Sequence, residues 1–573
     1  MTPAASFLTI FQAQAARAPS RTAVVDGMSS CRYDELDRWS TCLAAELRRR
    51  GIGRGDLAAV LIENSLELVV ALLAVMKAGG CYLPVDPRDP KERIESLLTA
   101  ARPVLCLTRD GSCPVSAAVP VIDVGGACLG QSAGSTLSPV TLSHHDLAYL
   151  IFTSGSTGSP KGVLVEHGAL ASYLLAATRE CPGLDGRVLV HSSPAFDFSL
   201  TCLLGALTSG GTLVVRTDAD LDDTNPADEK YTFVKLTPGH LELVRHYLPG
   251  WWPSRTLMVA GEAATASVLA PWRASNPDVT IVNEYGPTET TVGCCLHVVD
   301  SGQVLESGSV PIGGGLLGTE TYVLDDRLEP ADFGELYIAG PQIARGYLGR
   351  FAATASRFVA NPFDTSGSRM YRTGDLVRRR HGVLEYVARA DRQITIGGFR
   401  IEPEEVAATL MCAEGVARAA VISHEPDYGA VQLVAFVTVQ PSARCSPMEL
   451  RAFLAERLPS HLVPAHVVIL ARIPLTHTGK TDVAALSREF VPAGASATGA
   501  VLTADEDMLC RLASDVLGGV NLGPDDDFFG QGGTSMAAAR LVTRARAHGF
   551  TFGLTDVLRN RTVRKVLGPS FTR

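Results

Sequence analysis

The sequence predicts a multidomain α/β protein that ends in a small all-α unit. Its 573 residues correspond to about four compact units at roughly 150 residues per domain. From about residue 20 to 390, short β-branched runs alternate with longer helical patterns, as in layered α/β proteins. A smaller block of mixed strands and helices follows to about residue 490, and residues 503–573 show helical periodicity.

The elements of the large part follow this alternation. The strand-like run LAAVLI (57–62) precedes a helical pattern at 65–79. The strand-like run RVLVHS (187–192) likewise precedes a second helical stretch, and GVLEYVARAD (382–391) ends the large part. This rhythm predicts sheets covered by helices.

The sequence pattern changes after about residue 490. Residues 491–502 are mostly small and lack apolar periodicity, which predicts a flexible linker. Thr503 and Glu506 then form a capping box ahead of apolar residues at helical spacing. Further helices are expected from about Ser535 and after Leu554, so the last segment is predicted to be a helical bundle.

Composition narrows the class of protein. With 46% hydrophobic and 19% charged residues, the chain can build large cores, which excludes a disordered protein. The net charge of -9 provides no basic field that would attract nucleic acid. The longest apolar run, residues 68–76, is about half of the ~20 residues that a membrane-spanning helix needs. The N-terminal segment lacks the pattern of a signal peptide, and the 13 cysteines show neither zinc spacing nor a disulfide framework. We therefore expect a cytoplasmic small-molecule enzyme, with neither nucleic acid nor a membrane as partner.

The strongest motif is the run TSGSTGSPKG at residues 153–162, directly after the strand-like LAYLIF (147–152). Glycines let the backbone approach a ligand, hydroxyls and N–H groups supply donors, and a lysine adds a charge, which is the inventory for cradling phosphates. Pro160 stands where a Walker A loop needs glycine, so a P-loop NTPase is disfavoured. The candidate phosphate-binding residues are Thr153, Ser154, Gly155, Ser156, Thr157, Gly158 and Lys161.

Further motifs follow in a fixed order along nearly the whole chain. They are YDEL (33–36), KAGGCYLP (77–84), FDFS (196–199), NEYGPTE (283–289), GEL to ARGYL (334–348), YRTGDL (371–376), RADRQ (389–393), TGK (478–480) and DFF to GGTS (527–535). With these motifs the chain resembles the adenylation domain of a nonribosomal peptide synthetase, from the acyl-adenylate-forming superfamily, fused to a peptidyl carrier (thiolation) domain. The resemblance implies a large adenylation subdomain (1–390), a small α+β subdomain (391–490), a linker (491–502) and a four-helix-bundle carrier domain (503–573).

The resemblance also implies a reaction and its catalytic groups. Such enzymes convert a carboxylate to a mixed anhydride with AMP, and preorganised donors meet the charge that develops on the α-phosphate. By resemblance, Lys480 bridges the substrate carboxylate and the α-phosphate, Thr288 donates to that phosphate, and Glu289 holds Mg²⁺. The implied ligase consumes ATP and releases pyrophosphate.

The nucleotide site implied by the resemblance has four further members. Asp375 takes the ribose hydroxyls with Arg389 beside it, Tyr285 stacks on adenine, and Asn283 belongs to the same site. Asp391 lies where the large and small blocks meet and corresponds to the hinge of the family.

The terminal unit supplies the second half-reaction. By resemblance, Ser535 carries 4'-phosphopantetheine, which a phosphopantetheinyl transferase attaches, and its thiol takes over the acyl group as a thioester. Condensation, thioesterase and reductase segments are absent, so we expect a stand-alone loading didomain that serves a downstream tailoring or condensation enzyme in trans. The segment 357–371 resembles adenylation domains that need an MbtH-like partner.

The family's substrate-pocket positions map onto this chain residue by residue. They are Asp197, Phe198, Thr201, Lys235, Met258, Ala260, Glu284, Val292, Gly293 and Lys480. Asp197 would pair with an α-ammonium group. A cation and an anion together, Lys235 and Glu284, suit a side chain with both an acceptor and donors, as a carboxamide has. The set resembles the pattern for asparagine or a similar small polar amino acid.

Alternatives stay open at this point. Aspartate is the expected substrate if the charge of Lys235 dominates recognition of the side chain, and 2,3-diaminopropionate is expected if the charge of Glu284 dominates. A third alternative is that the two charges pair with each other and only line the pocket. An acyl-CoA ligase shares the phosphate loop, and a degenerate scaffold that presents a carrier is a non-enzymatic alternative. After the hinge, residues 393–398 read QITIGG and lack the two cations usual in the family, which bears on carrier docking.

Two other apparent motifs carry no function. The string G-x-G-x-x-G at 313–318 precedes a strand-like run where a dinucleotide fingerprint needs a helix, and His144-His145 is expected in a loop or cap.

Overall fold

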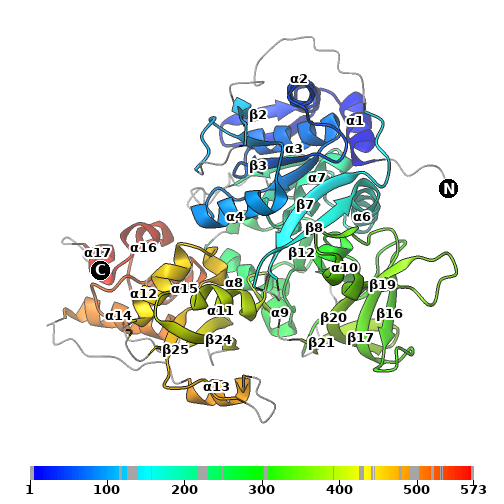
Figure 1. Cartoon of the computed structure of the whole chain (residues 1–573). Coiled ribbons are helices and arrows are strands. Elements are labelled where there is room, and N and C mark those ends of the chain that lie inside the picture. Colours follow the sequence, from blue (N-terminus) through cyan, green and yellow to red (C-terminus); the bar gives the residue numbers. More distant parts are fainter. Residues whose placement is uncertain are drawn as a thin grey trace. The chain divides into compact units, whose positions relative to one another are not determined.

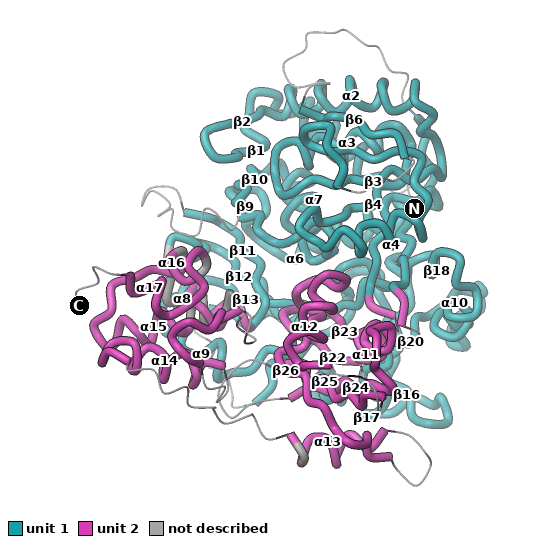
Figure 2. The backbone as a smooth tube through the Cα atoms, turned by 60° about the vertical axis from the view of Figure 1, so that its left-hand side comes forward, with its two compact units in different colours: residues 1–153, 160–238, 250–392 teal, residues 154–159, 239–249, 393–573 magenta. Residues whose placement is uncertain are grey.

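The computed structural model divides the chain into two compact units, teal and magenta in Figure 2. Unit 1 comprises residues 1–153, 160–238 and 250–392, and unit 2 comprises 154–159, 239–249 and 393–573. The structure describes residues 6–114, 119–125, 140–155, 158–216, 230–247, 249–301, 303, 308–391, 393–424, 431–440, 443, 445–475, 481–490, 502–517, 522–529, 531, 533 and 535–568.

A nine-stranded, mostly parallel sheet forms one part of unit 1. Its strand order is β15-β14-β13-β12-β11-β9-β10-β1-β2. The strands are β1 (Thr22–Asp26), β2 (Ser29–Arg32), β9 (Arg187–Val190), β10 (Thr212–Val215), β11 (Phe233–Leu236), β12 (Thr256–Ala260), β13 (Thr280–Tyr285), β14 (Cys295–Val299) and β15 (Gly314–Gly315). Strand β9 lies between β10 and β11, so the chain order switches there, and such a switch point opens a crevice at the carboxyl ends of the strands.

A second, seven-stranded sheet has the order β18-β8-β7-β4-β3-β5-β6. Its strands are β3 (Leu57–Leu61), β4 (Cys81–Pro84), β5 (Leu105–Thr108), β6 (Val121–Asp123), β7 (Leu147–Thr153), β8 (Lys161–Glu166) and β18 (Gly346–Tyr347). Strands β3 to β7 that pair here run parallel, whereas β7 and β8 form an antiparallel hairpin around the predicted phosphate loop.

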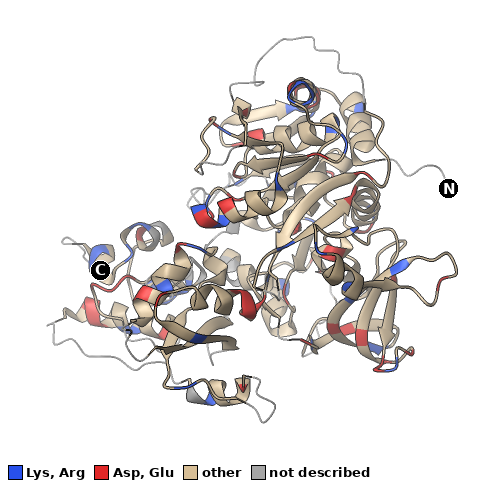
Figure 3. Ribbon diagram, in the orientation of Figure 1, with Lys and Arg blue, Asp and Glu red and all other residues tan. Residues whose placement is uncertain are grey.

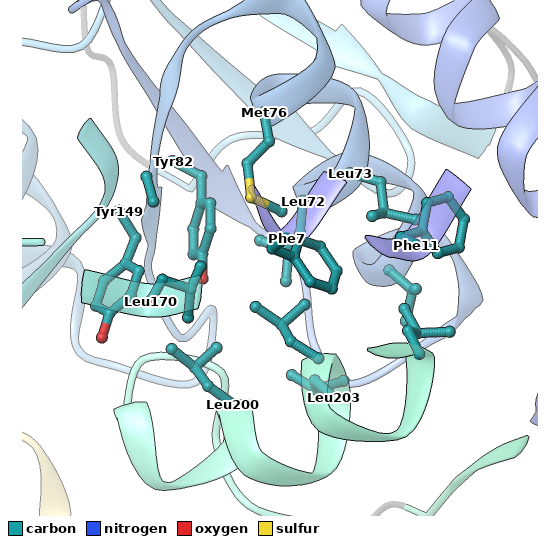
Figure 4. Close-up of a cluster of buried hydrophobic side chains, with 14 of the residues drawn as sticks. Phe7, Phe11, Leu72, Leu73, Met76, Tyr82, Tyr149, Leu170, Leu200 and Leu203 are labelled. Atoms are coloured by element: carbon teal, nitrogen blue, oxygen red, sulfur yellow. The ribbon is translucent and has the colours of Figure 1, made fainter. Parts of the chain in front are cut away.

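Helices pack against these sheets and contribute buried side chains to the core shown in Figure 4. The helices of this core are α1 (Phe7–Arg17), α2 (Tyr33–Arg49), α3 (Leu66–Ala78), α6 (His167–Glu180) and α7 (Leu200–Ser209). Unit 1 also contains α4 (Lys91–Ala101), α9 (Ala266–Ser275) and the short helices η1 (Asp197–Ser199) and η4 (Thr288–Thr290). Helix α8 (Pro238–Tyr247) belongs to unit 2 except for Pro238, and the short helix η3 (Pro249–Trp251) spans a boundary between the units. Every residue of α3 except Glu67 is buried, as its nearly continuous apolar sequence requires. In Figure 4 the rings of Phe7 and Phe11 lie against α3 and α7, and Tyr82 and Tyr149 stack beside Leu170.

An antiparallel sheet completes unit 1. It contains β16 (Glu320–Leu324), β17 (Phe333–Ala339), β19 (Phe358–Ala360), β20 (Arg369–Arg380) and β21 (Val383–Arg389), next to α10 (Phe351–Arg357). Strand β16 directly follows the glycines at 313–318, which confirms that this string is no dinucleotide fingerprint. His144 and His145 lie in a turn, as expected.

Unit 2 contains two smaller folds. The first has the hairpin β22 (Ile394–Ile396) and β23 (Phe399–Ile401), a sheet of β24 (Val416–His424), β25 (Gln432–Val439) and β26 (His466–Ile469), and helices α11 (Pro403–Met411), α12 (Pro447–Ala455), η5 (Ser460–Leu462) and α13 (Val483–Glu489). The second contains α14 (Ala504–Val516), α15 (Ser535–Ala547), α16 (Leu554–Asn560) and α17 (Val563–Leu567) (Figure 1).

The structure confirms the predicted fold class and the capping box of the last segment. Thr503 accepts from the Glu506 backbone N–H at 3.2 Å, and Glu506 accepts from the Thr503 N–H at 2.9 Å. Basic and acidic residues are interspersed along the elements of both units (Figure 3). Within the described residues, no helix is both long and apolar enough to cross a membrane.

Candidate active site

A buried polar cluster lies near the carboxyl ends of the central strands of the nine-stranded sheet. Lys235 on β11 and Glu284 on β13 are each less than 5% exposed, although lysine and glutamate are almost never buried without a partner. Strand β12 separates them in the sheet, with Met258 opposite Lys235 and Ala260 opposite Glu284. The sheet register therefore brings together four pocket residues that the sequence predicts.

The cluster is a closed ring of four side chains. The Lys235 ammonium donates to Glu284 Oε2 at 2.5 Å and to Thr201 Oγ1 at 2.7 Å. The Tyr173 hydroxyl lies 2.6 Å from Thr201 Oγ1 and donates to Glu284 Oε1 at 2.8 Å. The two predicted charges thus pair with each other, and two hydroxyls complete the ring.

Asp197 and Phe198 lie on η1, beside this ring. The Lys235 ammonium lies 4.5 Å from the centroid of the Phe198 ring, which is a cation–π contact. Asp197 is buried, and its Oδ2 has no hydrogen-bond partner among the described residues. Burial raises the pKa of the Asp197 carboxyl to about 6, although a hydrogen bond from Thr288 and the charge of Lys235 oppose the shift. A buried carboxylate oxygen without a partner is suited to an incoming cation.

Backbone conformation shapes the remaining pocket residues. Thr291 and Val292 have φ of 60° and 66°, values that β-branched residues rarely adopt. Gly293 follows, and a Cβ at this position would collide with Oε1 of Glu284. Glycine is therefore required here because the Glu284 carboxylate packs directly on its backbone.

The predicted ribose pair forms across two neighbouring strands. Arg389 on β21 donates from Nη1 to Asp375 Oδ1 on β20 at 2.8 Å, and Asp375 is buried. The Tyr285 hydroxyl donates to the other carboxylate oxygen at 2.5 Å. Asn283, also buried, donates its amide to the Pro311 carbonyl at 2.7 Å. The structure thus brings Arg389 and Tyr285 to the carboxylate of Asp375, whereas Asn283 contacts the Pro311 backbone.

The predicted hinge residue is held by two arginines. Arg389 contacts both carboxylate oxygens of Asp391 at 2.9 and 2.8 Å, and Arg357 contacts Oδ2 at 3.1 Å. Gly374, with φ of 78°, lies beneath this group, and a Cβ there would meet Arg389, Asp391 and Arg357. Asp375, Arg389, Asp391 and Arg357 therefore form a chain of alternating charges.

Tyr347 links the phosphate loop to the predicted metal residue. Its hydroxyl donates to Glu289 Oε1 at 2.7 Å, and the Lys161 ammonium lies 5.7 Å from its ring centroid. Burial and the Glu289 carboxylate raise the pKa of Tyr347, so that this hydroxyl stays protonated and donates. Thr288 is buried next to Glu289 on η4.

The rest of the phosphate loop is described in part. Thr153 ends β7, and Gly158, with φ of 79°, donates its N–H to the Gly155 carbonyl at 3.0 Å. Ser154 is buried. Ser156, Thr157 and Lys480 lie outside the described residues.

In the last segment, Ser535 is the first residue of α15. The loop before it is anchored by Phe528, which accepts from the Gly533 N–H at 2.9 Å and packs so closely that a Cβ on Gly533 would collide with its ring. Asp527 accepts from Arg561 at 2.9 Å. Phe528 of the DFF motif thus holds Gly533, two residues before Ser535.

Tyr173, Tyr347 and Arg357 contact site residues, although the sequence motifs assign them no role there. Tyr173 lies in the apolar helix α6, where nothing in the pattern separates it from core residues. Arg357 stands near the end of an exposed helix, α10, and Tyr347 occurs within the ARGYL motif. Asp391 lies 34 residues from Arg357, Glu289 lies 58 residues from Tyr347, and Glu284 lies 111 residues from Tyr173, so no local signal identifies these contacts.

Known proteins show which family the chain belongs to. Residues 11–348 match the AMP-binding enzyme family, residues 405–480 the AMP-binding enzyme C-terminal domain, and residues 507–568 the phosphopantetheine attachment site. Tyrocidine synthase 3 of Brevibacillus parabrevis is 37% identical over 93% of this chain, and a dimodular nonribosomal peptide synthase of Bacillus subtilis is 35% identical over 97%. The chain spans only 8% and 24% of the lengths of these two relatives.

A solved structure covers the whole arrangement of elements. Holo-PA1221, described as a nonribosomal peptide synthetase protein containing adenylation and carrier domains bound to a vinylsulfonamide inhibitor, aligns with a TM-score of 0.81 at 27% identity. The alignment covers 98% of this chain and 96% of that protein. The chain therefore belongs to the AMP-binding enzyme family, and its domain order is that of an adenylation domain followed by a peptidyl carrier domain.

Proposed function

We propose that the protein activates a small polar α-amino acid, most specifically asparagine, and loads it on its own carrier domain. In the first step a carboxylate oxygen of the amino acid attacks the α-phosphorus of ATP, and pyrophosphate leaves. In the second step the phosphopantetheine thiol on Ser535 attacks the acyl carbon and loses its proton, and AMP leaves. The observation that carries the proposal is the buried Lys235–Glu284 pair next to an Asp197 oxygen that has no hydrogen-bond partner within the described part of the chain.

Asp197 supports an α-amino acid over an aryl or fatty acid. Its Oδ2 is buried and unpartnered among the described residues, which is costly unless a donor arrives with the ligand. An α-ammonium group would supply that donor and a matching charge. Ammonium binding would also favour the ionised form of Asp197 over the form that burial favours.

The Lys235–Glu284 pair supports a neutral polar side chain. The pair carries no net charge, so a substrate side chain with a full charge would leave one buried charge unmatched. An ammonium has three N–H bonds, and the described residues accept two of those of Lys235. A carboxamide carbonyl could accept the third, while its NH₂ group donates to Glu284. Aspartate or 2,3-diaminopropionate would each satisfy only one side of the pair.

The nucleotide roles are part of the same proposal. Thr288 and Lys161 would donate to the phosphates, Asp375 with Arg389 would hold the ribose, and Tyr285 and Asn283 would line the nucleotide site. We assign Lys480, with its ammonium charge, to the substrate carboxylate and the α-phosphate. Losing one preorganised donor of this kind typically costs about 10²–10³ in rate.

Glu289 fits a magnesium site in this scheme. Mg²⁺ is commonly held by one or two carboxylates together with substrate phosphates, and the buried Glu289 carboxylate is oriented by the Tyr347 hydroxyl. When bound, the ion neutralises charge on the phosphates. Glu289 and the phosphates would hold it.

The carrier segment implies partners and domain limits. Ser535 at the start of α15, after a loop fixed by Phe528, suits modification by a phosphopantetheinyl transferase. We propose the domain division 1–390, 391–490, 491–502 and 503–573, with the hinge at Asp391 and a downstream tailoring or condensation enzyme that accepts the loaded amino acid in trans.

An MbtH-like partner is a further part of the proposal. Apolar side chains are exposed on the antiparallel sheet, where Phe363 stacks on Tyr322 at 4.6 Å and Phe333 is half-exposed. Rescue of poor solubility or activity by an MbtH-like protein would support this partner. Full activity without it would contradict the proposal.

ATP–pyrophosphate exchange with a panel of amino acids tests the function. We expect asparagine to give the highest kcat/KM, with aspartate and 2,3-diaminopropionate next. A preference for leucine or phenylalanine would contradict the polar-pocket argument. Acylation of free CoA by a Ser535→Ala variant would instead support an acyl-CoA ligase.

A further inference from the structure

The structure contains a group in the polar ring that none of the predicted pocket positions includes. Tyr173 reaches from the middle of α6 to Glu284 on β13, and its side chain is completely buried. We propose that Tyr173 is a specificity-determining residue that acts through Glu284 and makes the pocket select a neutral carboxamide over an amine. This inference rests on the proposed function and extends it to a residue outside the predicted pocket positions.

The hydrogen-bond order in the ring is fixed by chemistry. An ammonium can only donate, so Lys235 donates to Thr201 Oγ1 and to Glu284 Oε2. Tyr173 donates its one hydroxyl proton to Glu284 Oε1, so the contact between Tyr173 and Thr201 needs the Thr201 proton. Donation therefore runs from Lys235 through Thr201 and Tyr173 and ends on Glu284.

This order determines what Glu284 presents to a ligand. Oε2 is taken by Lys235, and Oε1 is taken by Tyr173. Oε1 is also the oxygen that packs against Gly293, a predicted pocket residue. With both oxygens already engaged, the carboxylate has room for a weak neutral donor but little remaining charge for a second cation.

Burial keeps Tyr173 in its donor form. Burial and the Glu284 carboxylate both raise the pKa of the hydroxyl well above its usual value. Tyr173 is thus a neutral donor near neutral pH.

Tyr173→Phe removes the hydroxyl and keeps the ring of the side chain. Oε1 of Glu284 then loses a hydrogen bond and offers more negative charge to the pocket. A cationic side chain such as that of 2,3-diaminopropionate gains from this charge, whereas a carboxamide loses an oriented acceptor. A hydrogen bond to a charged group corresponds to roughly a 10-fold to 100-fold effect on binding.

The experiment compares the two amino acids on one protein preparation, using the full-length chain in ATP–pyrophosphate exchange. The ratio of kcat/KM for 2,3-diaminopropionate to that for asparagine does not depend on the active fraction. We expect Y173F to raise this ratio at least 10-fold, mainly through KM. The matched control is Tyr149→Phe, because Tyr149 is equally buried and its hydroxyl has no partner among the described residues. Y149F should leave the ratio within twofold of the wild type.

A double-mutant cycle separates the proposed role from a packing role. In an E284Q background, Y173F should change the ratio less than twofold, because the group through which Tyr173 acts is gone.

If Y173F does not fold, T201V provides the test, since Thr201 supplies the proton that orients Tyr173. A ratio raised severalfold in T201V supports the inference. A wild type that prefers asparagine and an unchanged ratio in Y173F or T201V would overturn only this inference. A wild type that rejects all polar amino acids would overturn both this inference and the proposed substrate.

Discussion

Asp375 and Arg389 lie directly opposite each other on β20 and β21, with Nη1 of the arginine 2.8 Å from Oδ1 of the aspartate. Both side chains are largely buried, so the pair is held by the sheet and needs little ordering when a ligand binds. Asp375→Asn removes the charge while keeping the shape. We expect the KM for ATP in pyrophosphate exchange to rise at least 10-fold with little change in the KM for the amino acid. Arg380→Ala, which removes an exposed pair at the far end of the same two strands, is the control and should leave both constants unchanged.

The buried ion pair of Lys235 and Glu284 predicts non-additive stability. Removing one member leaves the other charge buried, which typically costs about 3–5 kcal/mol. We expect K235M and E284M each to lower the melting temperature strongly, and the double variant K235M/E284M to lower it less than the sum of the two. Thermal unfolding followed by circular dichroism measures this. Additive losses would mean that the two charges do not depend on each other.

Asp197 predicts a pH dependence of substrate binding. Its pKa is raised by burial to about 6, so below that pH the free enzyme presents a neutral carboxyl to an α-ammonium group. We expect the KM for asparagine to rise about tenfold for each pH unit below 6, while the KM for ATP changes less. An Asp197→Asn variant should bind weakly at every pH, without this slope. A wild-type KM that stays flat between pH 5 and 7.5 would contradict the assignment.

The same shift has a consequence for stability. The pKa of Asp197 in the folded protein lies above the unfolded value of 3.8, so the folded protein holds the Asp197 proton more tightly than the unfolded chain does. Proton binding therefore stabilises the folded protein at low pH, and this stabilisation is lost as the pH rises through about 6. D197N should therefore raise the melting temperature at pH 7.5 relative to the wild type. The gain should shrink below pH 4. A gain of the same size at both pH values would point to a packing effect.

Asp391 predicts a split between the two half-reactions. Asp391→Pro fixes φ at the predicted hinge, so adenylate formation should persist while loading of the carrier falls at least 10-fold. Pyrophosphate exchange measures the first step and radiolabelled amino-acid transfer to the holo protein the second. Asp391→Ala is the control, because it removes the contacts with Arg357 and Arg389 but leaves φ free. Equal losses in both steps for the proline variant would exclude a hinge role.

Local motifs predicted much of the site because their residues lie close in sequence. Glu284, Thr288 and Glu289 fall within one strand and the short helix after it. The pairing of β11, β12 and β13 then places Lys235 and Met258 at the same end of the sheet. The alternation of apolar and turn residues likewise predicted the layers, because burial of whole faces imposes that pattern.

The remaining contacts depend on residues that are distant in sequence. The hydroxyl of Tyr285 meets Asp375 across 90 residues, and Tyr173 meets Glu284 across 111. Tyr173 does not differ from a core tyrosine in its local pattern, and the NEYGPTE motif that contains Tyr285 does not indicate its contact with Asp375. Both contacts come from the packing of elements that are distant in sequence, which no short sequence window records.

We propose that this chain activates asparagine with ATP and holds it as a thioester on Ser535. Intact-protein mass spectrometry of the phosphopantetheinylated protein, after incubation with ATP, Mg²⁺ and asparagine, detects this thioester as added mass. We expect a mass gain of one asparaginyl group that disappears in a Ser535→Ala variant, which still catalyses pyrophosphate exchange. No mass gain on the wild type with any amino acid, together with no release of pyrophosphate, would contradict it.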